Sequence, residues 1–169
     1  EIGRNRLQLP IASIQHLIST MSASADSDHL SLSLERVLDL LARGEMQAQG
    51  LLPWSSNYTF LVRLTLDELE TAALYKPREG ERPLWDFPDG TLCQREVAAF
   101  VVSQALDWLI VPPTVLRDGL HGIGMVQFYI DCNPDEHYFT LQEETRFHDQ
   151  FRQIALFDLA VRRVAELDE

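Results

Sequence analysis

The sequence has 169 residues, of which 46% are hydrophobic, so it can form one domain, or one lobe and part of another, around its own core. Its formal net charge of −12 argues against nucleic acid and anionic lipid surfaces as partners, because both are bound by clusters of lysine and arginine. Cys93 and Cys132 form no CxxC pair and no metal-type spacing, so a reducing cytoplasm is the expected compartment. No apolar run is long enough for a membrane span, and no membrane insertion is expected.

Residues 1–32 are expected to be an N-terminal extension and linker, ahead of a lobe at 33–132 and a helical segment at 133–169. Ile11, Ile14 and Ile18 have near-helical spacing, and a polar run follows at 22–28. Two alternatives are equally credible here. Either Met21 is the natural start, or residues 1–20 form a helix docked on the domain.

A helix capped by Ser33 is predicted to run to Arg43, and two strands should follow it, near 46–51 and at 58–64. The turn between these strands contains Ser55, Ser56 and Asn57. Their hydroxyl, amide and backbone N–H groups are suited to cradling phosphate. An ordinary polar turn is an equally good interpretation.

The next strand, at 71–75, ends at Lys76, because Pro77 has no N–H group for a sheet ladder. A surface loop should follow, in which Trp85 and Phe87 pack the loop against the next helix rather than stack on a ligand. That helix is predicted at 91–108, with a capping box formed by Thr91 and Gln94. Its expected apolar face is made by Val97, Phe100, Val101, Ala105 and Trp108.

Glu96 lies in the predicted first turn of this helix, opposite the strand end that carries Lys76. A strand lysine that faces a helix glutamate is the ion pair with which kinase-like folds hold ATP phosphates. The two residues also have ordinary interpretations. A strand-end lysine is commonly solvated, and an early helix glutamate commonly serves the helix dipole.

A second hairpin is predicted from a strand at 114–117 and a strand at 124–130, with a loose tip at His121 and Gly122. In a kinase-like fold the residues that end such a strand form the hinge whose backbone binds adenine. Here they are Tyr129, Ile130 and Asp131. A plain edge strand is the alternative interpretation.

The last predicted element is a long helix from Leu141, opened by a capping box of Thr140 and Glu143. Its expected buried stripe consists of Phe147, Phe151, Ile154, Ala155 and Val161. His137 and His148 have no metal-ligand spacing, and no metal site is expected there.

Residues 38–161 resemble an actinobacterial protein family that is distantly similar to phosphatidylinositol 3-/4-kinases. The resemblance is carried by Tyr75-Lys76-Pro77, Leu84-Trp85-Asp86-Phe87-Pro88, Arg95-Glu96-Val97-Ala98-Ala99 and Ile110-Val111-Pro112-Pro113-Thr114. It implies an α+β fold with a kinase-like N-lobe, made of an antiparallel sheet and one packed helix, followed by the first helix of a C-lobe.

The resemblance also implies a cytoplasmic phosphotransferase that binds ATP with Mg²⁺ and acts on an unknown acceptor. Lys76 would hold the α- and β-phosphates and Glu96 would orient Lys76. The turn at Ser55, Ser56 and Asn57 would cover the phosphates. The backbone at Ile130 and Asp131 would meet adenine.

Two segments of the family pattern are not found in the sequence: a catalytic loop of the type Asn-Asn-x-Asp-Arg-Lys and a metal-binding Asp-His-Gly. No catalytic residue is therefore assigned, and the chain is expected to be truncated or to omit a segment after Val161. The alternative function is a non-catalytic module that binds nucleotide or a protein partner. Exposed apolar surface on the C-terminal helix would allow homo-oligomers.

Overall fold

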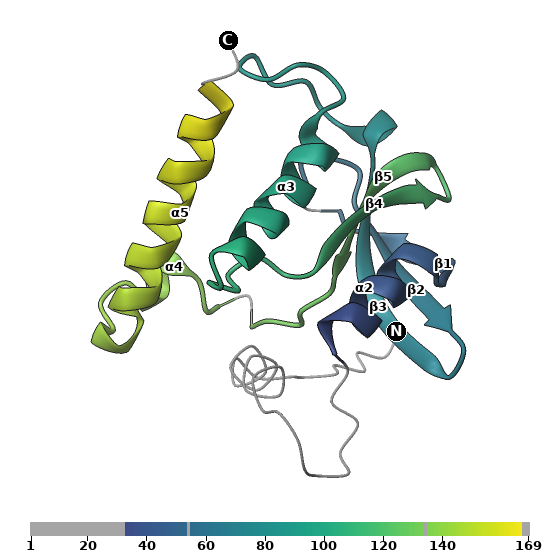
Figure 1. Ribbon diagram of the computed structural model, residues 1–169, viewed down its shortest axis with the longest axis horizontal. Helices are drawn as coiled ribbons and strands as arrows, with labels where there is room; N and C mark the ends of the chain where they lie inside the picture. Colours follow the sequence, from purple (N-terminus) through teal and green to yellow (C-terminus); the bar gives the residue numbers. More distant parts are fainter. Residues whose placement is uncertain (1–32, 54, 134, 167–169) are drawn as a thin grey trace. The chain divides into compact units, whose positions relative to one another are not determined.

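The computed structural model describes residues 33–53, 55–133 and 135–166, which belong to two compact units. One unit is His29–Tyr129, and the other includes Ile130–Glu169. The expectations for residues 1–32 lie outside the described residues. The chain has a mixed α+β fold, with a sheet and helices in the first unit and helices in the second (Figure 1).

The first unit is built on a five-stranded antiparallel sheet with the strand order β1-β2-β3-β5-β4. Consecutive strands pair as hairpins, except that α3 intervenes between β3 and β4. The strands are β1 (Glu45–Leu51), β2 (Phe60–Leu66), β3 (Leu69–Pro77), β4 (Thr114–Gly119) and β5 (Gly122–Phe128). The predicted strands are confirmed in type and order, with two corrections to their ends. β3 includes Pro77 as its last residue, which pairs with Gly124, and β5 ends at Phe128, before the predicted Tyr129 and Ile130.

Helix α2 (Leu34–Arg43) packs on one face of this sheet. Ser33 caps it as predicted, since its hydroxyl accepts a hydrogen bond from the Arg36 N–H group. The core on this face combines α2 with alternate residues of β2, β3 and β5, as period-two side-chain alternation requires. Its fully or almost fully buried members are Val37, Leu40, Leu41, Val62, Leu64, Ala73, Tyr75 and Val126.

Helix α3 (Leu92–Ala105) lies on the opposite face, where its buried residues are Cys93, Phe100 and Ser103. The predicted apolar face was wrong in part, because Val101 is 54% exposed and Ala105 is exposed. The helix ends before Trp108. Glu96 falls in its second turn, which places the glutamate on the same stripe as Cys93 and Phe100.

The tip of the β4–β5 hairpin is held in place, contrary to the expectation of a loose tip. The Tyr75 hydroxyl donates to the Gly122 carbonyl (2.6 Å) and accepts from the His121 N–H group (3.1 Å). The His121 ring stacks on Phe60, with 4.6 Å between ring centroids. A buried tyrosine thus uses its only polar group to fix the hairpin.

The second unit contains α4 (Tyr138–Leu141), the 3-10 turn η2 (Thr145–Phe147) and α5 (His148–Glu166). The long helix therefore begins at His148 and not at Leu141. The predicted capping box of Thr140 and Glu143 was wrong, because Thr140 forms its capping box with His137 at the start of α4. The predicted stripe is only partly covered: Phe151 meets Tyr138 at 5.1 Å between ring centroids, whereas Ile154 is 48% exposed.

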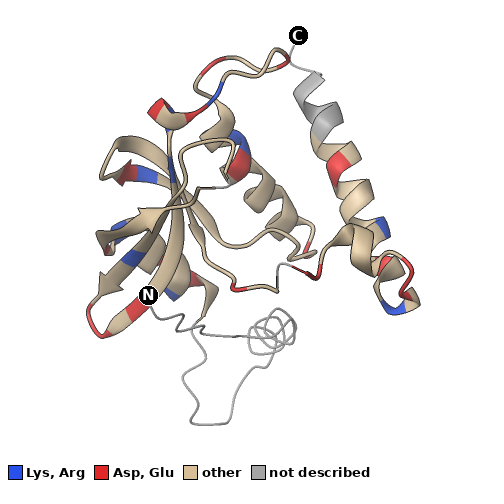
Figure 2. Cartoon of the chain, turned by 180° about the vertical axis from the view of Figure 1, so that it is seen from behind, with Lys and Arg blue, Asp and Glu red and all other residues tan. Residues whose placement is uncertain are grey.

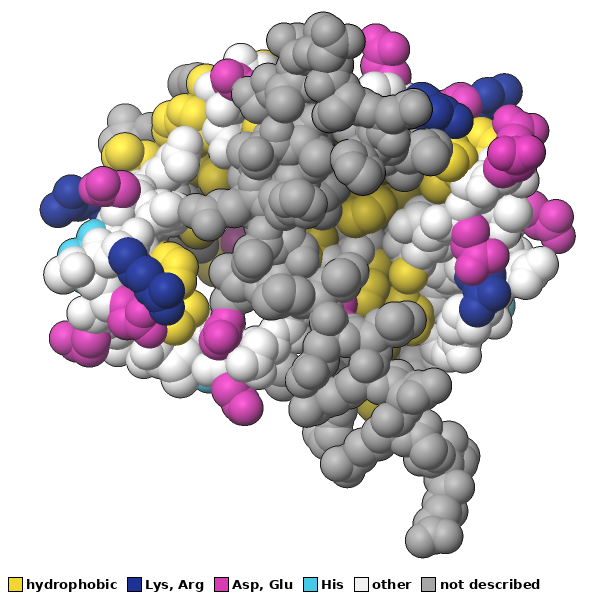
Figure 3. All heavy atoms as spheres, turned by 90° about the horizontal axis from the view of Figure 1, so that it is seen from below, with side chains coloured by type: hydrophobic (Ala, Val, Ile, Leu, Met, Phe, Trp, Pro, Cys, Tyr) yellow, Lys and Arg dark blue, Asp and Glu magenta, His cyan; other side chains and the backbone are white. Residues whose placement is uncertain are grey.

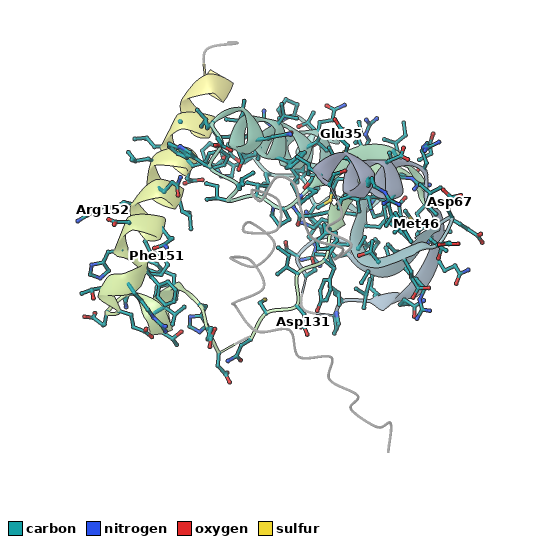
Figure 4. All side chains as sticks on the ribbon, turned by 60° about the horizontal axis from the view of Figure 1, so that its bottom comes forward. Glu35, Met46, Asp67, Asp131, Phe151 and Arg152 are labelled. Atoms are coloured by element: carbon teal, nitrogen blue, oxygen red, sulfur yellow. The ribbon has the colours of Figure 1, made fainter. Side chains whose placement is uncertain are left out.

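Phe151 and Arg152 leave α5 on different sides, as neighbouring residues of a helix do (Figure 4). None of the helices among the described residues combines the length and the apolar character that crossing a membrane requires.

Candidate functional site

The ammonium group of Lys76 and the carboxylate of Glu96 form an ion pair between β3 and α3. The Lys76 Nζ atom lies 3.0 Å from Glu96 Oε1 and 2.8 Å from Oε2. The side chains are 24% and 30% exposed, so the pair is mostly but not fully shielded from solvent. The structure thus brings together the two residues that were predicted to pair. Because three N–H donors sit on one ammonium, Lys76 retains donor capacity toward a further anion.

The direction of Lys76 follows from the alternation of side chains along β3. Tyr75 is fully buried on the α2 face, so its neighbour Lys76 must point to the α3 face. Met125, which is opposite Lys76 in the β3–β5 register, is fully buried on that same face. The lysine stem therefore lies beside an apolar floor, and its charged end reaches α3.

Lys76 is the only lysine among the 14 lysine and arginine residues of the sequence. Every other basic position carries the planar guanidinium of arginine, which favours bidentate contact with one anion. An ammonium is compact and can share its donors between a carboxylate and a phosphate. The one lysine of the sequence is therefore also the residue that forms the ion pair with Glu96.

The start of α3 is capped by Glu81, which the sequence reasoning did not identify. Glu81 Oε2 accepts from the Leu92 N–H group (3.0 Å) and Oε1 accepts from the Cys93 N–H group (2.7 Å). The predicted capping box of Thr91 and Gln94 was wrong, because the Thr91 hydroxyl donates to the Pro88 carbonyl instead. A carboxylate at a helix N-terminus also meets the positive end of the helix dipole.

The Cys93 thiol lies in the same place. Burial raises the pKa of Cys93, and the neighbouring Glu81 carboxylate raises it further by hydrogen bonding and by its charge. The thiol is therefore protonated near neutral pH. We infer no reactive role for it.

The β1–β2 loop lies at the end of the sheet where Lys76 leaves β3, because Phe60 at the start of β2 pairs with Tyr75. Two of the side chains that were predicted to bind phosphate, those of Ser55 and Asn57, form hydrogen bonds within the first unit. The hydroxyls of Ser55 and Thr59 are 2.6 Å apart, and Asn57 Oδ1 accepts from the Arg82 N–H group at 3.0 Å. Ser56, between them, is exposed.

Two half-buried leucines continue the face on which Lys76 lies. Leu74 precedes Lys76 by one full alternation of β3, and Leu61 is directly opposite Leu74 on β2. Apolar residues at the base of a cationic group provide a surface for a flat aromatic ring. These residues were not among the predicted site residues.

The predicted adenine contacts, Ile130 and Asp131, follow directly after Tyr129, whose N–H group donates to the Ala72 carbonyl at 3.2 Å. They begin the second compact unit, on the segment that leads from β5 to α4 (Figure 4). The structure therefore groups Lys76, Glu96 and the β1–β2 loop in one unit and places Ile130 and Asp131 in the other.

Trp85 and Phe87 were both predicted to pack the loop between β3 and α3 against the helix, and this is confirmed for one of them. Phe87 does pack against α3, because the Arg95 guanidinium lies 4.1 Å from the centre of its ring. Trp85 is 97% exposed, so its predicted packing role was wrong.

Charges of both signs are interspersed on the described helices and strands (Figure 2), and basic side chains lie next to acidic ones on the surface seen in Figure 3. Among the described residues, no group of three His, Cys, Asp or Glu side chains could hold a metal ion. His137 and His148 instead contact nearby backbone groups in their own unit.

The sequence is similar to that of the protein Rv2133c from Mycobacterium tuberculosis. The two are 50% identical over 91 residues, which are 54% of this chain and 33% of that protein. The matched part of the chain thus spans about a third of the relative's length. No protein-family model matches the sequence, and no solved structure is similar to it.

Proposed function

We propose that this chain is the nucleotide-binding part of a kinase-like phosphotransferase with an unknown acceptor, and that it binds ATP with Mg²⁺. The proposal rests on one observation. Lys76, the only lysine of the sequence, forms a half-buried ion pair with Glu96 between the end of β3 and α3. In this assignment Glu96 orients the Lys76 ammonium, and the ammonium binds the α- and β-phosphates.

The surroundings of the pair support the same assignment. The β1–β2 loop with Ser55, Ser56 and Asn57 lies at the Lys76 end of the sheet, where it can cover phosphates through backbone N–H groups. Leu61 and Leu74 provide a half-buried apolar face for the adenine ring. The contact of Ile130 and Asp131 with adenine stays a prediction from the family resemblance.

Phosphoryl transfer also needs residues that orient the acceptor and ligate Mg²⁺. The proposal assigns neither role to the described residues, so Mg²⁺ would be held by the phosphates. A non-catalytic nucleotide-binding module remains the second candidate, because the proposal assigns described residues to nucleotide binding and none to phosphate transfer. A phosphate-transfer assay on the nucleotide-bound protein separates the two.

The binding step is tested by thermal unfolding with and without Mg-ATP. A ligand at about 100 times its dissociation constant stabilises a protein by about 2.7 kcal/mol. We expect Lys76→Ala to abolish this stabilisation while the variant stays folded. Arg63→Ala is the matched control, since Arg63 lies on the same sheet face in an ion pair with Glu70. Unchanged stabilisation of Lys76→Ala by Mg-ATP contradicts the assignment.

A further inference from the structure

Residues 80–82 contact both of the parts that flank the Lys76 ammonium, the β1–β2 loop and α3. We propose that Glu81 is a positioning residue for the Lys76–Glu96 pair, and that residues 80–82 couple the β1–β2 loop to α3. That this coupling affects nucleotide binding rests on the proposed function. The effect of Glu81 on the ion pair does not.

On the loop side, two hydrogen bonds and one close packing contact fix the segment. The Tyr58 N–H group donates to the Gly80 carbonyl (3.1 Å), and the Arg82 N–H group donates to Asn57 Oδ1 (3.0 Å). A Cβ atom at Gly80 would lie 2.6 Å from Tyr58 Cβ, so only glycine allows this approach. The loop is therefore held to the segment at Tyr58 and Asn57.

On the helix side, Glu81 binds two consecutive backbone N–H groups with its two carboxylate oxygens. A carboxylate held at both oxygens fixes the rotation of the first helical turn as well as its distance. Glu96 follows Cys93 by three residues and therefore lies on the same side of α3. The contact at Cys93 thus determines where the Glu96 carboxylate points.

Small rotations are enough to break the pair. A side-chain end about 5–6 Å from the helix axis moves by about 2 Å when the helix rotates by about 20°. The Lys76–Glu96 hydrogen bonds, at 2.8 and 3.0 Å, do not survive such a displacement. Removal of the Glu81 carboxylate should therefore change the environment of the Lys76 ammonium, through α3 and Glu96.

The test uses the single lysine as its own reporter. Protein labelled with ¹³C and ¹⁵N in lysine gives a single side-chain Nζ signal, that of Lys76, and the measurement is made in the absence of any nucleotide. The variants are Glu81→Gln, the exposed matched control Glu79→Gln, and Glu96→Gln as the reference for a broken pair. We expect the Lys76 signal of Glu81→Gln to move toward its position in Glu96→Gln, and that of Glu79→Gln to stay at the wild-type position. Acylation of Lys76 should be up to about 5-fold faster in Glu81→Gln.

The proposal is overturned if the Leu92 and Cys93 amide signals show that the cap is lost while the Lys76 signal stays in place. Should Glu81→Gln fail to fold, Glu81→Asp replaces it, because it keeps the charge and shortens the side chain by one methylene group. The Lys76 signal of Glu81→Asp is then compared with the signals of the wild type and of Glu96→Gln in the same way. Failure of wild-type protein to bind Mg-ATP overturns the proposed function only, since this experiment contains no nucleotide.

Discussion

Gly124 lies so close to the strand that carries Lys76 that a single methyl group should destabilise the sheet. A Cβ atom at this position would lie 2.7 Å from Pro77 Cα and 2.8 Å from Tyr75 Cε2, and would also overlap the Lys76 carbonyl oxygen. Overpacking of this kind costs about 1–3 kcal/mol, and the upper end applies because two of the three contacts are with backbone atoms. We therefore expect Gly124→Ala to lower the free energy of unfolding by about 3 kcal/mol, or the Tm by about 6–12 °C.

Gly50→Ala is the matched control for this substitution. Gly50 lies on β1 of the same sheet, and a Cβ atom there would meet nothing within 4 Å. Its replacement should be neutral or stabilise by about 0.4–1 kcal/mol, because alanine restricts the unfolded chain. Urea unfolding followed by circular dichroism measures both variants. Free energies of unfolding that agree within about 0.5 kcal/mol would refute the reasoning.

Two further predictions concern polar contacts of the same sheet. Burial raises the pKa of Tyr75 above its ordinary 10.0. The contribution of the protonated hydroxyl to the free energy of unfolding is therefore fully present below pH 10 and is lost as the pH rises through the raised pKa. Tyr75→Phe should lower the free energy of unfolding by about 1–2 kcal/mol at neutral pH. In urea titrations above pH 10 the free energies of unfolding of the variant and the wild type should come closer together. A difference that stays constant with pH would contradict the stated cause. Arg117 donates from Nη1 to the Leu41 carbonyl (3.1 Å) and the Gly44 carbonyl (2.9 Å) at the end of α2. Arg117→Ala should therefore cost about 1 kcal/mol in the same assay, against no measurable change for the exposed Arg146→Ala.

The sequence predicted the parts of the fold that depend on local pattern. Alternating apolar residues located the strands, and Ser33 located the start of α2, because these signals act within a few residues. The Lys76–Glu96 contact was also predicted, on a strand end and a helix start combined with a family resemblance.

Contacts between residues distant in the sequence were not predictable in the same way. Glu81 caps α3 from eleven residues before Leu92, so the local signal at Thr91 was misleading. Ser103 was assigned no role from the sequence, yet its buried hydroxyl accepts from the N–H groups of Ile110 (3.0 Å) and Val111 (3.2 Å). Tryptophan is a residue type that is buried on average, but the path of its loop exposes Trp85 to solvent.

The irregular register of β1 has a consequence for how copies of this chain meet. β1 is an outer strand of the described sheet, and its pairing with β2 shifts between Ala48 and Gly50. An uninterrupted outer strand invites a second molecule to continue the sheet, and a bulge interrupts the row of N–H and C=O groups that such growth requires. The irregular pairing of β1 thus disfavours continuation of the sheet by a second molecule. Straightening β1 by deletion of Gln49 would favour self-assembly through this strand.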